Sequence, residues 1–216
     1  MQYQDHKVDV LSFFTGHVLK YLLPDIQKLD SITADADGTG GGCAVPQALA
    51  SFAATDLFGY LVSPDTPDTI RMHMQPFLRN SRYFPVAGQI GQLNDFIASF
   101  RDDVRSFLTH RFFLGQYDIG KIPQDDLFVV NNGIVIFNVS YFSKLVCAGI
   151  LTIHREISED RFIIAGNTGL ESVQLFYNRL QALKGHTSGS FPAASSGLAM
   201  HSSTGTAEST ASLDRS

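Results

Sequence analysis

Residues 127–159 read LFVVNNGIVIFNVSYFSKLVCAGILTIHREISE, and they contain both kinds of secondary structure that the chain is expected to use. The first part places Asn131-Asn132-Gly133 between two β-branched and aromatic runs, Leu127 to Val130 and Ile134 to Val139. Asn-Gly favours a two-residue hairpin turn because both residues tolerate positive φ, so the pattern predicts a β-hairpin. Apolar residues three and four apart predict a helix over the second part, from Tyr141 to about Glu159.

Helical patterns lie on both sides of this stretch. On the amino-terminal side, they predict helices over about 5–29 (with a kink or break at Pro24), 46–62, 68–76 and 91–113. On the carboxyl-terminal side, one helix is predicted over Leu170 to Lys184, and residues 185–216 are predicted to be a disordered tail rich in Ser, Thr, Ala and Gly. The sequence therefore predicts a mainly α fold in a single domain over 1–184, a bundle of about five to six helices with one small β-hairpin near 127–139.

Composition excludes several classes of protein. A net charge of -5 excludes a basic protein that coats DNA, although a local basic site remains compatible with it. Cys43 and Cys147 lie far apart without a CxxC pattern, which excludes a disulfide framework and a zinc ribbon. The first ten residues lack the basic and apolar regions of a signal peptide, and the apolar stretch 141–153 is too short to span a bilayer. We therefore expect a cytoplasmic protein with no membrane partner.

The loop DADGTGGG at 35–42 permits two functional interpretations. A calcium loop is excluded because Pro46 occupies the twelfth position, where a bidentate Glu is needed. A phosphate cradle fits less well than a simple connector, because the Lys-Ser/Thr of a P-loop is missing and Asp35 and Asp37 would repel phosphate. A small-molecule enzyme using Gly38 to Gly42 remains a third alternative. The histidines and paired acids show no ligand spacing, so no metal and no cofactor are predicted.

Chemistry-bearing residues concentrate in the stretch 100–113, FRDDVRSFLTHRFF. Arg105 and His110 stand late on a strongly periodic helix with four residues between them, and Arg111 follows. Here the sequence resembles the HEPN superfamily, small helical domains defined by an Arg, about four to six residues and a His. That superfamily includes metal-independent ribonucleases and degenerate, non-catalytic relatives. The resemblance implies RNA or nucleotide binding and a symmetric homodimer that places two Arg/His pairs across one cleft.

The resemblance also implies a role for each residue. Arg105 and His110 would be catalytic, and Arg101, Ser106 and Arg111 would bind substrate. Cleaving RNA without a metal needs a base for the 2′-hydroxyl proton and cationic donors for the phosphorane charge, which a histidine and an arginine supply. Five helical residues correspond to a rotation of about 140°, so the two side chains converge only where the helix ends or distorts, or where a second subunit completes the site. In active relatives Asn, Asp or His usually follows the Arg, whereas Ser106 does so here.

A structural explanation of the same residues stays open. Arg105 could pair with an acid at 102–103 on a solvated helix face, and His110 could cap the carboxyl end of the helix. Arg179 and His186 also have the permitted spacing, at the edge of the predicted tail, so spacing alone is not specific.

Two functions are therefore carried forward. The first is a HEPN-like domain that binds RNA or a nucleotide and could cleave RNA. The second is a non-catalytic helical module that dimerises or docks a protein partner through an apolar face. The 17 Phe and 7 Tyr fit either function. The aromatic residues considered for such an interface are Phe112, Phe113, Phe137 and Phe142.

Overall fold

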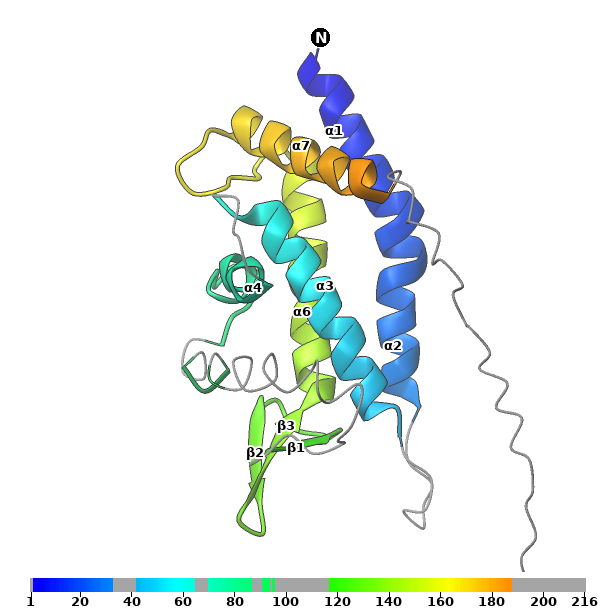
Figure 1. The fold of residues 1–216 in the computed structure, drawn as a ribbon, viewed down its shortest axis with the longest axis vertical. Helices are drawn as coiled ribbons and strands as arrows, with labels where there is room; N and C mark the ends of the chain where they lie inside the picture. The colour runs from blue at the N-terminus through cyan, green and yellow to red at the C-terminus, as the bar shows by residue number, and fades with distance from the viewer. Residues whose placement is uncertain are drawn as a thin grey trace, which may run out of the picture.

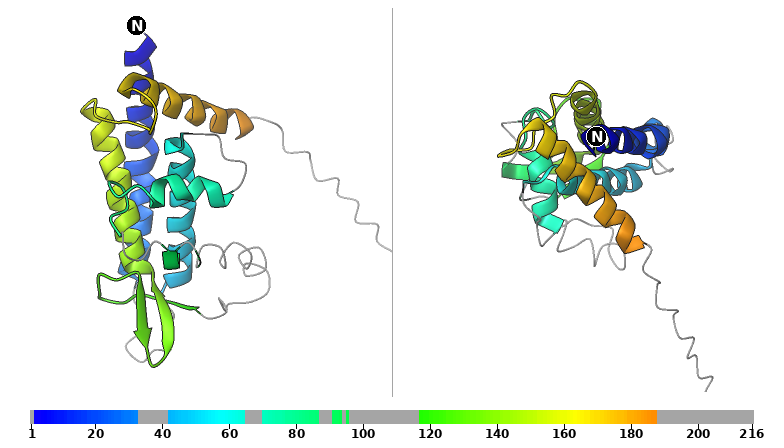
Figure 2. Two further views of the ribbon diagram at one scale, coloured as in Figure 1. Left: turned by 90° about the vertical axis from the view of Figure 1, so that its left-hand side faces the viewer. Right: turned by 90° about the horizontal axis from the view of Figure 1, so that it is seen from above.

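The computed structural model describes residues 2–32, 42–64, 70–86, 91–93, 95 and 117–187. Long helical segments lie side by side, another helix crosses their upper end and a small sheet lies at the lower end (Figure 1). The two further views in Figure 2 show the same arrangement, with the hairpin of the sheet projecting from the base of the bundle. This confirms the mainly α fold with a small β element.

The first long segment consists of α1 (Gln2–Phe13), a π-helical stretch η1 (Phe14–Leu22) and α2 (Leu23–Ser31). The backbone is helical at both junctions, and the N–H of Leu23 donates to the carbonyl oxygen of Val18, five residues earlier. The chain stays helical through Pro24, so the alternative of a break there was wrong. The change of hydrogen-bond register just before Pro24 accommodates a residue that has no N–H to donate.

The second long segment, α3 (Ala44–Val62), occupies the centre of the bundle. It contacts α2, α4, α6, α7 and β1, and apolar residues lie all around it, as expected for a buried helix. Pro46 lies in its first turn, as predicted. The shorter helix α4 (Ile70–Leu78), which contains Pro76, crosses α3. The two backbones approach so closely that a Cβ added at Gly59 would lie 1.7 Å from the carbonyl oxygen of His73.

The sheet contains three strands in the order β1-β3-β2. β2 (Phe128–Asn131) and β3 (Ile134–Asn138) form the predicted hairpin, with Asn132 and Gly133 at φ 50° and 80° in its turn. β1 (Tyr117–Gly120) pairs in parallel with β3 and was not predicted. The buried Asn138 joins the sheet to the next helix, since its side chain donates to the carbonyl oxygens of Ile122 at 3.0 Å and Gln124 at 2.8 Å.

The third long segment is α6 (Val139–Ser158), and α7 (Gly169–Thr187) crosses the end of the bundle opposite the sheet. Both helices were predicted, although α7 continues three residues beyond Lys184. An aromatic cluster that includes Phe52, Phe137 and Phe142 lies between the helices and the sheet. Within the described ranges, no helix is long and apolar enough to cross a membrane.

Candidate functional site

The residues singled out by the sequence motif, Arg101, Arg105, Ser106, His110 and Arg111, all lie outside the described residues. The helix predicted over 91–113 is therefore seen only at its start, where residues 91–93 and 95 are helical. The glycine-rich loop and the predicted tail also lie outside, apart from Gly42 and the residues up to Thr187. The structure thus tests the framework around the motif and not the motif itself.

Two aromatic residues considered for an interface instead belong to the core. Phe137 and Phe142 are fully buried, and their ring centroids lie 5.2 Å apart. Both rings also pack against Phe52 on α3. The hairpin and the start of α6 fold back onto α3, so this pair stabilises the monomer and is closed to a partner.

Arg179, the arginine of the second Arg…His spacing, has a structural role in the fold. Arg179 on α7 is 5% exposed, and its guanidinium donates to the carbonyl oxygens of Tyr60 at 2.8 Å and of Ser63. These carbonyls belong to the last turn of α3 and the residue after it, where helical partners are missing. The guanidinium also stacks over the Tyr60 ring at 5.6 Å. Arg179 therefore caps α3.

A polar network joins α2, α3 and α6 near the sheet. Asp30 Oδ1 accepts from Gln47 Nε2 at 2.8 Å and from Ser140 Oγ at 2.6 Å. Gln47 Nε2 also donates to Ser143 Oγ at 3.0 Å, and that hydroxyl lies 2.7 Å from Ser51 Oγ. Gln47, Ser51 and Ser143 are buried. The network therefore fixes how the three helices pack against one another and does not form a surface that faces solvent.

The ammonium group of Lys121, just after β1, also binds the end of α2. It donates to the carbonyl oxygens of Asp30 at 3.1 Å and Ile32 at 2.7 Å, and also to that of Leu29. A cation at the carboxyl end of a helix satisfies the free carbonyls and opposes the helix dipole. The end of β1 is thereby attached to the end of α2.

A cavity of about 290 Å³ lies between α2 and α6, with Asp30, Ser143 and Cys147 among its lining residues. Burial, with the Asp30 carboxylate as a smaller cause, raises the pKa of the Cys147 thiol to about 11. A thiol with this pKa is protonated at neutral pH and is a poor nucleophile. Cys147 is thus a packing residue and not a candidate nucleophile.

We expect Cys147 to resist alkylation in the folded protein. At pH 8 a thiol with this pKa is ionised in roughly one molecule in a thousand, and the residue is 7% exposed, whereas Cys43 is half-buried. Iodoacetamide followed by peptide mass spectrometry should find Cys43 modified first, with Cys147 modified only after denaturation. Equal modification of both thiols in the native protein would contradict the buried position of Cys147.

Between α3 and α4, Asp56 and His73 form a half-buried pair with 3.5 Å between Oδ1 and Nδ1. Burial raises the pKa of the Asp56 carboxyl, and the neighbouring His73 lowers it in part. The His73 ring lies 5.3 Å from that of Tyr60. The pair helps to hold α4 against α3. In the parts of the chain that the structure describes, no cluster of three or more His, Cys, Asp or Glu side chains could hold a metal ion.

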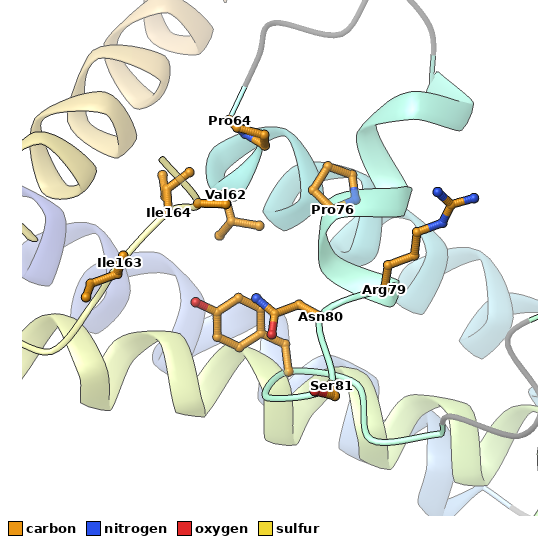
Figure 3. Close-up of a pocket in the computed structure, with 10 residues that line it drawn as sticks. Val62, Pro64, Pro76, Arg79, Asn80, Ser81, Ile163 and Ile164 are labelled. Atoms are coloured by element: carbon orange, nitrogen blue, oxygen red, sulfur yellow. The ribbon is translucent and has the colours of Figure 1, made fainter. Parts of the chain in front are cut away.

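A second cavity, of about 380 Å³, opens between the ends of α3 and α4 and the chain after α6. Figure 3 shows Ile163 and Ile164 on one side, Pro76 and Arg79 on the other, and Asn80 with Ser81 below, while the Arg79 guanidinium is directed away from the centre. Its described lining residues are Val62, Pro64, Pro76, Arg79, Asn80, Ser81, Tyr83, Ile163, Ile164 and Ala165.

Behind this cavity lies a buried carboxylate. Glu156 on α6 is 5% exposed, forms an ion pair with Arg82 and accepts a hydrogen bond from Tyr83 Oη at 3.3 Å. Burial and the Glu156 charge raise the pKa of the Tyr83 phenol, which therefore stays neutral. Sequence reasoning missed this site, although the polar run Arg79-Asn80-Ser81-Arg82 after a proline-containing helix was the available signal.

Comparison with known proteins adds no relative. No family model matches the sequence, and neither the curated proteins nor the solved structures include a significant match. The function must therefore be argued from the residues of this chain.

Proposed function

We propose that the protein is a HEPN-like domain that binds RNA and cleaves it without a metal ion, acting in the cytoplasm. The observation that carries the proposal is the concentration of Arg101, Arg105, His110 and Arg111 within eleven residues of a chain whose net charge is -5. The mainly α fold supports it, because the superfamily that the motif resembles is helical. Unpaired Cys43 and Cys147 are compatible with a reducing compartment.

In this proposal each residue has one task. His110 takes the proton from the 2′-hydroxyl as that oxygen attacks the phosphorus, and Arg105 stabilises the charge that develops on the phosphate oxygens. Arg101 and Arg111 hold the flanking phosphates, and Ser106 donates a hydrogen bond to the substrate. A two-fold dimer supplies the second Arg/His pair across the cleft.

The strand that follows the motif in the sequence is held in place at the base of the bundle. Residues 96–116 lead directly into β1, which starts at Tyr117 and is an edge strand of the sheet. Lys121 then holds the end of β1 against α2. The chain that follows the motif is therefore anchored from Tyr117 onward.

We expect purified protein to degrade total RNA in the presence of EDTA, and His110→Ala to abolish this activity. Arg105→Lys should lower it by about tenfold or more, because a point charge cannot replace two parallel donors. His186→Ala is the matched control, since His186 belongs to the other Arg…His spacing, and it should cleave like wild type. The measurement is the initial rate of RNA loss on a gel.

The controls define what would contradict the catalytic assignment. Equal cleavage by wild type and His110→Ala would remove His110 from the reaction, and loss of activity in His186→Ala alone would move the site to α7. Far-ultraviolet circular dichroism should first show that all variants are folded, so that a lost activity is not a lost fold.

The second candidate function is a non-catalytic module that binds a partner, and one feature of the sheet favours it. Val130 and Ile134 flank the hairpin turn and are 69% and 48% exposed. Val130 lies on β2, an edge strand, where an exposed apolar edge invites pairing with another chain. Intact RNA in every sample of the preceding experiment would make this module the preferred function.

A further inference from the structure

The cavity in Figure 3 has three adjacent donors that the rest of the described protein does not use. The Arg79 guanidinium, the Asn80 amide nitrogen and the Ser81 hydroxyl have no hydrogen-bond or ion-pair partner among residues with described positions. By contrast, Arg82 on the same turn is paired with Glu156, and Arg179 on α7 donates to backbone carbonyls. Arg79 and Ser81 are exposed and Asn80 is half-buried, so all three donors are free to bind an acceptor that enters the cavity from solvent.

One hydrogen bond fixes the direction of the Asn80 amide. Asn80 Oδ1 accepts from the backbone N–H of Arg82 at 3.1 Å, so the oxygen is held on the protein side. The amide nitrogen, which can only donate, then lies on the other side. The surrounding turn is also fixed, because the Asn80 carbonyl accepts from the N–H groups of Tyr83 at 2.9 Å and Phe84 at 2.8 Å.

The local charge is positive. Arg79 and Arg82 lie on this turn, and among the described lining residues there is no carboxylate. The nearby Glu156 is buried and already neutralised by Arg82. A cationic ligand would therefore find no counter-charge in the described wall, whereas an anion would meet donors and an unpaired guanidinium.

The remaining wall is apolar and partly flat. The rings of Pro64, Pro76 and Tyr83 belong to the lining, and Val62, Ile163 and Ile164 complete it. A volume of about 380 Å³ lies at the small end of the range typical of ligand sites. We propose that this cavity binds a small ligand with an anionic head group, a carboxylate or a phosphate, on a flat apolar body. The argument for this cavity uses neither Arg105 nor His110.

In the proposed complex, the head group accepts from Asn80 Nδ2 and the Ser81 hydroxyl. The exposed side chain of Arg79 swings inward from its outward position to pair with the charge. The apolar body replaces water against the prolines and Ile164. Because the Asn80 turn is already hydrogen-bonded in place, only Arg79 must be reoriented on binding.

The test uses saturation-transfer NMR on the full chain with three probes: phenylacetate, phenyl phosphate and phenethylamine. We expect saturation transfer to at least one anion and none to the amine, and the stronger anion identifies the head group. Asn80→Asp keeps the acceptor for the Arg82 N–H but replaces the donor with a negative charge, and it should reduce the signal at least about tenfold. Arg79→Gln should reduce it similarly.

Arg155→Gln is the matched control, since it removes one exposed positive charge from α6 outside the cavity and should leave binding unchanged. An equal signal from phenethylamine, no signal from either anion, or an unchanged signal in Asn80→Asp with an unchanged Tm would each overturn the proposal. None of these results bears on RNA cleavage, so the two proposals fail separately.

Discussion

Gly59→Ala is expected to destabilise the protein by about 3 kcal/mol or more, because the new methyl group would collide with backbone and not with a movable side chain. A Cβ at this position would lie 1.7 Å from the His73 carbonyl oxygen and 3.0 Å from the Met74 Cα. Relief requires α4 to move away from α3, which would also separate His73 from Asp56. Urea denaturation followed by circular dichroism measures the loss, which corresponds to a fall in Tm of roughly 10 °C.

Gly16→Ala is the matched control, and it is expected to stabilise the protein rather than destabilise it. Gly16 is an exposed helical residue in η1, and nothing lies within 4 Å of a Cβ added there. Alanine should therefore stabilise the helix by about 0.5–1 kcal/mol. If Gly59→Ala unfolds at the same urea concentration as wild type, the close contact between α3 and α4 is wrong.

Arg179→Met is expected to cost about 3 kcal/mol, the second large effect. The methionine fills a similar volume but leaves the carbonyl oxygens of Tyr60 and Ser63 without their buried donor, and it removes the cation from the Tyr60 ring. Arg179→Lys keeps the charge but lacks the planar guanidinium, so its free energy of unfolding should lie between those of Arg179→Met and wild type. The free energy of unfolding in urea ranks the three proteins.

The control for Arg179→Met is the same substitution at an exposed arginine. Arg161 is 63% exposed and pairs with the exposed Glu159, so Arg161→Met should change stability by no more than about 0.5 kcal/mol. A similar loss in both variants would mean that burial of the Arg179 guanidinium contributes nothing specific.

Local sequence patterns were sufficient to predict the hairpin turn and the helices α6 and α7. The Asn132-Gly133 turn forms as predicted because both residues adopt positive φ, which the flanking strands require. The apolar spacing of residues 141–159 and 170–184 likewise predicted α6 and α7. The same reasoning missed β1, since a run of only four residues that ends in glycine is too short to indicate a strand by itself, and it pairs in parallel with the distant β3.

Residues whose role depends on distant parts of the chain were not predictable in this way. Arg179 stands in a helical pattern where a solvated face is the ordinary expectation, and only the end of α3, more than a hundred residues earlier, explains its burial. Asn80 and Ser81 line a cavity only because residues 163–165, far away in the sequence, form its other wall. The interface suggested for Phe137 was wrong because α3 supplies Phe52 as its partner.

RNA cleavage by Arg105 and His110 is tested best with single-stranded RNA oligonucleotides and their all-deoxy counterparts, in EDTA, with mass spectrometry of the products. Attack by the 2′-oxygen forms a new P–O bond and breaks the bond to the 5′-oxygen, which takes up the proton. We predict RNA fragments ending in 2′,3′-cyclic phosphate and 5′-hydroxyl, intact DNA, and no fragments with His110→Ala. Intact RNA with wild type, cleaved DNA, or cleavage that creates a new 3′-hydroxyl together with a 5′-phosphate would contradict the proposed reaction.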